Sequence, residues 1–126
     1  MSVSSAQLER RRVVVDLAIS LASAGGYEAV QMRPISEETG VALGTLYSWF
    51  ESKDLLLLEV MARWMTDVCS ELRLRPVTGT TAAERVNVRL EQALDLSMAE
   101  PVRFRACVRA FTVPETGGSD AIVRID

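Results

Sequence analysis

Apolar residues recur at three- and four-residue intervals along most of the chain, and the breaks in this pattern fall at residues that begin or end helices. Val14, Ala18 and Ala22 form one such stripe, and the pair of glycines at 25–26 ends it. Ser4, with Gln7 three residues later, has the pattern of a capping box before the stripe. The pattern therefore predicts a first helix that runs to about residue 24.

A long helix is predicted near the middle of the chain. Ser52 is a suitable N-cap for a helix at about residues 53–74, and Pro76 prevents its continuation. Its apolar stripe contains Met61, Trp64, Met65, Val68 and Cys69.

Two further helices follow the long one. Thr81 and Glu84 form a capping box for a helix at about residues 82–99. Pro101 suits the first turn of a last helix at about 101–112, because its missing N–H has no partner there in any case. The apolar side of that last helix consists of Phe104, Cys107, Val108 and Phe111. Because the pattern is helical almost throughout, the predicted fold class is all-α.

Residues 31–50 have the pattern of a short helix, a tight turn and a second short helix. Gly40 can adopt the left-handed conformation that ends a helix, and Val41 can then return to the core. Leu46 and Phe50 follow Val41 at helical spacing and are expected to pack inward with it. This is the layout of a helix-turn-helix, the unit that places a helix in the major groove of DNA.

The outer side of the second short helix carries small or polar-tipped residues. Gly44 costs about 1 kcal/mol inside a helix relative to alanine, which favours a close approach by a DNA backbone. Thr45 and Tyr47 bring hydroxyls suited to phosphate oxygens, and Lys53 adds a cation just beyond the helix. The other residues on this side are Leu43, Ser48 and Trp49.

The tract G-V-A-L-G-T-L-Y-S-W-F-E-S-K-D-L-L, residues 40–56, resembles the end of the DNA-binding domain of TetR-type transcriptional repressors. Upstream, G-G-Y-E-A-V-Q-M-R at 25–33 resembles the KstR-type branch, the repressors of actinobacterial sterol catabolism. The resemblance implies a three-helix DNA-binding domain at about residues 1–51 and a partial helical ligand-binding and dimerisation domain at 52–126. It also implies a ligand-responsive repressor that binds a near-palindromic operator in double-stranded DNA.

The resemblance implies a set of DNA-contacting residues: Gln31, Arg33, Ala42, Leu43, Gly44, Thr45, Tyr47, Ser48, Trp49 and Lys53. Gln31 replaces the usual Thr or Ser, which weakens the capping role, and Trp49 stands where the family mostly has His or Tyr. The alternative for Tyr47 and Trp49 is an ordinary core role, since aromatic residues at helical spacing are more often buried than functional.

The resemblance also implies a hydrophobic inducer, such as a steroid or an acyl thioester. Its contacts would come from Met61, Trp64, Met65, Val68, Cys69, Phe104 and Phe111. The alternative is that this apolar stripe is simply core. A typical family member has several more helices, including the two that form the dimer bundle, so a homodimer is expected for the family but its dimerisation helices are not recognisable in this chain.

Composition bears mainly on which chemistries are excluded. The chain has 126 residues and no histidine, so neither a Cys-His zinc site nor a Ser-His nucleophile pair can form, and the prediction is a non-enzyme without metal or cofactor. Its two cysteines, Cys69 and Cys107, are expected to be buried free thiols in a reducing cytoplasm. No run of apolar residues is long enough for a membrane span.

The net charge of −3 runs against the basic footprint of most DNA-binding proteins. The arginines at 10–12, together with Arg33 and Lys53, are expected to supply local positive charge instead. The weak basicity keeps a second hypothesis open, a helical ligand-binding or protein-interaction module that has lost DNA binding.

Overall fold

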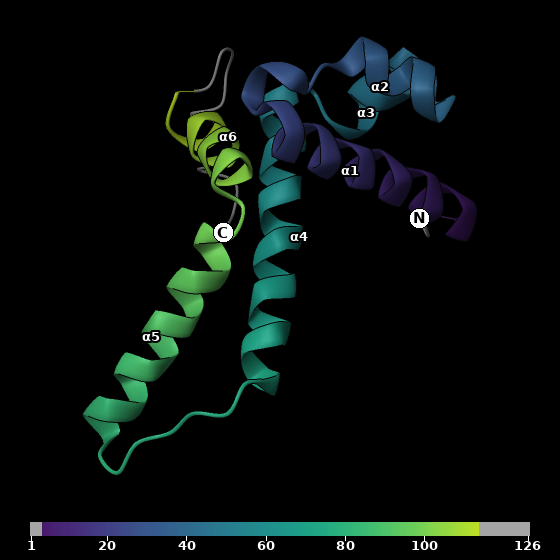
Figure 1. The fold of residues 1–126 in the computed structure, drawn as a ribbon. Helices are drawn as coiled ribbons and strands as arrows, with labels where there is room; N and C mark the ends of the chain where they lie inside the picture. Colours follow the sequence, from purple (N-terminus) through teal and green to yellow (C-terminus); the bar gives the residue numbers. More distant parts are fainter. Residues whose placement is uncertain (1–3, 114–126) are drawn as a thin grey trace.

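The computed structural model describes residues 4–113, which form an all-helical fold and confirm the predicted class (Figure 1). The elements in chain order are α1 (Ser5–Gly25), the 3-10 turn η1 (Tyr27–Ala29), α2 (Met32–Thr39), α3 (Leu43–Trp49), α4 (Lys53–Leu74), α5 (Ala82–Met98) and α6 (Pro101–Thr112). Residues 114–126 of the expected second domain lie outside the described residues. α2 and α3 lie together near one end of α4, and the connection to α5 lies at the other end.

The predicted helix starts are confirmed by their caps. The Ser4 hydroxyl accepts a hydrogen bond from the Gln7 amide at 3.2 Å, and the Ser52 hydroxyl accepts one from the Leu55 amide at 3.2 Å. At the start of α5 both halves of the Thr81 capping box are formed. Each cap gives an otherwise unpaired amide a partner, and this is why the helices begin where the sequence indicated.

One continuous core joins α1, η1, α2, α3, the first half of α4, and α6. Leu56, Leu57 and Val60 of α4 are fully buried in it, together with Val14 and Ala18 of α1. The core therefore runs across residues 51 and 52 without a break. The division into two domains at that point remains a prediction.

Of the apolar side predicted for α6, only Cys107 is buried. The buried residues of α6 are Ala106, Cys107 and Ala110, and their small side chains let the helix lie close to α1 and α4. Phe104 and Val108, predicted as part of the apolar side, are each 37 % exposed, and Phe111 is 46 % exposed.

α5 has no buried residue at all. Its apolar stripe is exposed along its length and consists of Val86, Leu90, Leu94 and Met98. Polar contacts attach it to the end of α4: the Arg89 guanidinium binds the carbonyl of Leu72 and, at 3.5 Å, that of Arg75. The Gln92 amide donates to the carbonyl of Pro76 at 2.9 Å.

Both cysteines are free thiols, but only Cys107 is buried. Burial raises the pKa of the Cys107 thiol to about 11, an effect that the nearby Arg103 charge partly opposes. Cys69 is exposed on α4, so the prediction of a buried thiol there was wrong. Within residues 4–113, no helix has the length and apolar character needed to span a membrane.

Candidate nucleic-acid interface

The turn between α2 and α3 is held by side chains as well as by its glycine. Gly40 has φ +73° in the left-handed region, and its amide donates to the Ser36 carbonyl at 2.9 Å. The Ser36 hydroxyl donates to the Val41 carbonyl at 2.6 Å, and the Thr39 hydroxyl accepts from the Val41 amide at 3.3 Å. These bonds fix the angle at which α3 leaves the turn. The role of Ser36 was not predicted; a serine four residues before a helix-ending glycine is the signal that could have indicated it.

The inward face of the helix-turn-helix agrees with the sequence pattern. Val41, Leu46 and Phe50 are 2 %, 0 % and 2 % exposed. Their burial sets the rotation of α3 about its axis, because the opposite side of the helix must then face solvent.

Ala42, Gly44, Tyr47 and Ser48 are exposed on that opposite side. Tyr47 is 46 % exposed, so it is not an ordinary core aromatic. A Cβ atom added at Gly44 would meet nothing within 4 Å. Nothing in the described part of the chain therefore requires a glycine at this helical position, although glycine lowers helix stability.

Leu43, Thr45 and Trp49 are only half-buried. Leu43 and Trp49 pack against the core, so the core role considered for Trp49 accounts for part of its surface. The Ser48 hydroxyl donates to the Thr45 carbonyl at 2.6 Å, so its hydrogen is already used and its exposed oxygen can act only as an acceptor. α3 thus presents a surface of small groups and hydroxyls with apolar edges.

Three further predicted DNA contacts lie outside α3, two at the start of α2 and one at the start of α4. Gln31 is the N-cap of α2 but makes no side-chain cap bond; its amide donates to the Glu28 carbonyl at 3.2 Å. Arg33 is exposed and has no acidic partner among residues 4–113. Lys53 is the first residue of α4, is half-buried, and has its Nζ 3.8 Å from the centre of the Tyr27 ring.

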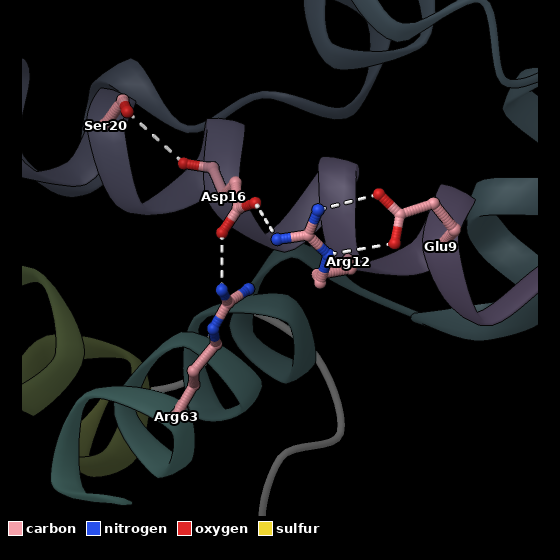
Figure 2. Close-up of polar contacts among 5 residues, drawn as sticks. All are labelled: Glu9, Arg12, Asp16, Ser20 and Arg63. Atoms are coloured by element: carbon pink, nitrogen blue, oxygen red, sulfur yellow. Dashed lines mark hydrogen bonds and ion pairs between the residues drawn. The ribbon is translucent and has the colours of Figure 1, made fainter. Parts of the chain in front are cut away.

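The N-terminal arginines add less positive charge than their number indicated. Arg12 binds Glu9 at 2.7 Å and Asp16 at 3.5 Å, and Asp16 also binds Arg63 of α4 at 2.7 Å (Figure 2). The hydrogen bond from Arg12, reinforced by its charge, holds the pKa of Glu9 below its usual value. A further contact in this network, also drawn in Figure 2, runs from the Ser20 hydroxyl to the Asp16 carbonyl at 3.2 Å.

Arg11 also has partners. It approaches Glu59 at 3.6 Å and lies over the Phe50 ring at 4.8 Å, at the end of α3. Of the three N-terminal arginines, only Arg10 has no charged partner in the described chain. Among these predicted cations, those without an acidic partner in the described residues are Arg10, Arg33 and Lys53.

The residues predicted to contact an inducer are divided between two sides of α4. Trp64 and Val68 are buried, and Trp64 meets Phe104 edge-on with ring centres 6.2 Å apart. Met61 is half-buried and packs against the core. Met65 and Cys69 instead line a shallow surface cavity of about 270 Å³, and Phe111 is exposed on α6. Trp64 and Phe104 are thus the pair that the fold brings together.

Residues 14–60 match the family described as "Bacterial regulatory proteins, tetR family". The matched segment includes the helix-turn-helix and the first turns of α4. This match, over residues 14–60, confirms the TetR-type resemblance predicted from the tract at 40–56.

Among the individual relatives, the HTH-type transcriptional repressor KstR of Rhodococcus jostii is 37 % identical over 122 residues, 97 % of this chain and 57 % of that protein. The repressors of the same name from Mycobacterium tuberculosis and Mycolicibacterium smegmatis are 32 % and 34 % identical over 98 % and 94 % of this chain, and 56 % and 58 % of their own lengths. The similarity to KstR-type repressors predicted from residues 25–33 is therefore confirmed. The chain spans a little over half the length of these relatives.

Proposed function

We propose that this chain is a sequence-specific DNA-binding transcriptional repressor in which α3 enters the major groove. The proposal is supported most directly by the exposed side of α3, where a glycine that the fold does not require lies beside hydroxyl-bearing residues. Gly44 lets a DNA backbone or base edge approach the helix closely, Thr45 and Tyr47 bind phosphate oxygens, and Ala42 and Leu43 make apolar base contacts. Ser48, Trp49, Gln31, Arg33 and Lys53 complete the proposed interface.

The rival hypothesis is a helical ligand-binding or interaction module that no longer binds DNA. It leaves Gly44 unexplained, since a helix released from DNA gains about 1 kcal/mol by replacing this glycine with alanine. The family match and the repressor relatives also favour DNA binding.

Gly44→Ala separates the two hypotheses because stability and binding move in opposite directions. The free energy of unfolding is expected to rise by up to about 1 kcal/mol, while DNA affinity falls by about tenfold or more through the lost close approach. The measurements are thermal denaturation and fluorescence anisotropy with a duplex selected by the wild-type chain from a random-sequence pool.

Ser70→Ala is the matched control, because it also improves helix propensity at an exposed site but lies on α4 away from α3. It should leave DNA affinity unchanged. If Gly44→Ala stabilises the chain and binds DNA as tightly as the wild type, the interaction-module hypothesis gains and the proposed interface is wrong.

The proposal includes the partners that the family resemblance implies. The operator is near-palindromic and binds a homodimer whose two α3 helices are separated by about 34 Å, one turn of DNA. A repressor that acts on bacterial DNA works in the cytoplasm. The oligomeric state on selected DNA, measured by light scattering, tests this part; one chain bound per duplex would contradict it.

The proposed inducer is hydrophobic, with a steroid or an acyl thioester as the candidates. Trp64 and Phe104 support this part, because their edge contact bridges α4 and α6 while Phe104 keeps 37 % of its surface exposed. Calorimetry with a steroid acid and with an acyl thioester is the test. A lack of heat with both, in a chain that binds DNA, would overturn the inducer and leave the repressor proposal in place.

A further inference from the structure

The Tyr27 ring of η1 lies between the start of α4 and α6. It is 5 % exposed, and two cations lie over it: the Lys53 ammonium at 3.8 Å and the Arg109 guanidinium at 4.0 Å from the ring centre. One face of a ring has room for one cation at this distance, so the two approach from opposite sides. Tyr27 is thus held between the first residue of α4 and the last turn of α6.

Two carboxylates balance these charges. The Tyr27 hydroxyl donates to Asp54 Oδ1 at 2.7 Å, and the Asp54 side chain is buried directly after Lys53. On the other side, Arg109 binds Glu28 at 2.7 Å, and Glu28 is the neighbour of Tyr27 in η1. The attraction of each cation for the ring is therefore not cancelled by repulsion between the two cations.

The contact matters for Lys53 because a free lysine side chain is flexible. Ordering a lysine costs side-chain entropy when it binds a phosphate, and an ammonium already held over a ring has lost much of that freedom. The ring interaction is electrostatic and leaves N–H donors for a phosphate oxygen. Lys53 makes no ion pair or hydrogen bond within residues 4–113, so these donors have no competing acceptor there.

We propose that Tyr27 is a positioning residue that holds the Lys53 ammonium in place to bind a DNA phosphate. Arg109 of α6 contacts the other face of the same ring and fixes the position of the ring. The inference rests on the proposed function. It adds a role for Tyr27 that neither the sequence pattern nor the family comparison indicated. A displacement of α6 that removes Arg109 from Tyr27 would then weaken DNA binding through Lys53, without any contact between α6 and DNA.

The test is a double-mutant cycle between Arg109→Gln and Lys53→Ala, read by DNA affinity at several salt concentrations. Lys53→Ala should lower the slope of the logarithm of the binding constant against the logarithm of salt by about 0.9, the value for one lost phosphate contact. Arg109→Gln should weaken binding by about two- to fivefold in the wild type and have no further effect in the Lys53→Ala background.

Arg105→Gln is the matched control, because Arg105 lies one turn earlier on α6 and is exposed, and the substitution removes the same charge. Arg105 lines the same surface cavity as Tyr27 and Arg109, but the cations over the ring are those of Lys53 and Arg109. Equal effects of the Arg105 and Arg109 variants would overturn the inference, as would an Arg109 effect that persists without Lys53. An unchanged salt slope for Lys53→Ala would also overturn it while leaving the repressor proposal intact. No binding by the wild-type chain would overturn both.

A measurement without DNA tests the ring contact itself. A cation over an aromatic ring has its Hε protons shifted upfield in the NMR spectrum. Tyr27→Phe, which keeps the ring, should retain this shift for Lys53, and Arg109→Gln should reduce it. Lys53 resonances at random-coil positions in the wild type would show that the ring does not hold the ammonium.

Discussion

The two ends of α4 differ in what surrounds them, although the helix is amphipathic over both. At its start, Leu56, Leu57 and Val60 are fully buried among α1, α2, α3 and α6. At its other end, Leu74 is 86 % exposed and the adjacent α5 buries no residue. An apolar stripe thus predicts which side of a helix is suited to packing. Whether that side is buried depends on whether other helices pack against it.

Because the two regions differ in burial, the same Leu→Ala substitution should lower the free energy of unfolding by different amounts in each. Leu46→Ala in the core of the helix-turn-helix should lower the free energy of unfolding by about 2–5 kcal/mol, because Leu46 is 0 % exposed and leaves a cavity. Leu90→Ala on α5, at 56 % exposure, should change it by less than about 0.5 kcal/mol. Urea denaturation of both variants is the measurement. Similar losses would mean that α5 is covered in solution and that the two ends of α4 are alike.

Two glycines of the helix-turn-helix are expected to respond in opposite directions to the same substitution. Gly40→Ala should destabilise the chain by about 1–2 kcal/mol, because φ is +73° there and an L-residue is strained in that region. This is opposite in sign to the stabilisation expected for Gly44→Ala, although an added Cβ would meet nothing within 4 Å at either position. Thermal denaturation compares them directly. Stabilisation by both substitutions would show that the turn is not left-handed in solution.

The smallest predicted difference is in the reactivity of the two thiols, of which Cys107 is buried in the core and Cys69 is exposed on the second half of α4. Cys69 on α4 is exposed and should react with iodoacetamide in the native chain, whereas Cys107 should react only after denaturation. The folded-state pKa of Cys107 is raised to about 11, so its contribution to stability is complete below the unfolded-state pKa near 9.0 and is lost as the pH rises through 11. Mass spectrometry of the alkylated chain counts the labels. Two labels on the native chain at pH 8 would place Cys107 outside the core.

Much of this fold could be predicted because its signals are local. The starts of α4 and α5 follow from the caps Ser52 and Thr81, and the last turn of α2 follows from Gly40. Each of these residues acts on backbone groups only a few positions away, so a short stretch of sequence is enough to predict the helix boundary. The inward face of α3 was predictable for the same reason, since Val41, Leu46 and Phe50 are adjacent turns of one pattern.

The contacts between distant residues could not be predicted in this way. Arg109 and Tyr27 come from elements at opposite ends of the described chain, and no spacing indicates that they meet. On α6 the sequence pattern indicated Cys107 but not Ala106 and Ala110, because large apolar residues give the stronger pattern whereas close packing against α1 and α4 favours small side chains. The arginines near the N-terminus form a cluster in sequence, but Arg12 is already paired within its own helix.

Gly44 also carries information about selection. Most random substitutions destabilise a protein, while stabilising ones are easy to find and are tolerated where function does not oppose them. A lineage in which this surface stopped binding DNA would therefore be expected to replace Gly44 with alanine or another helix-forming residue early, well before the core residues around Leu46 changed. Under the proposed function, the residue at this position among homologous chains would record whether α3 still binds DNA.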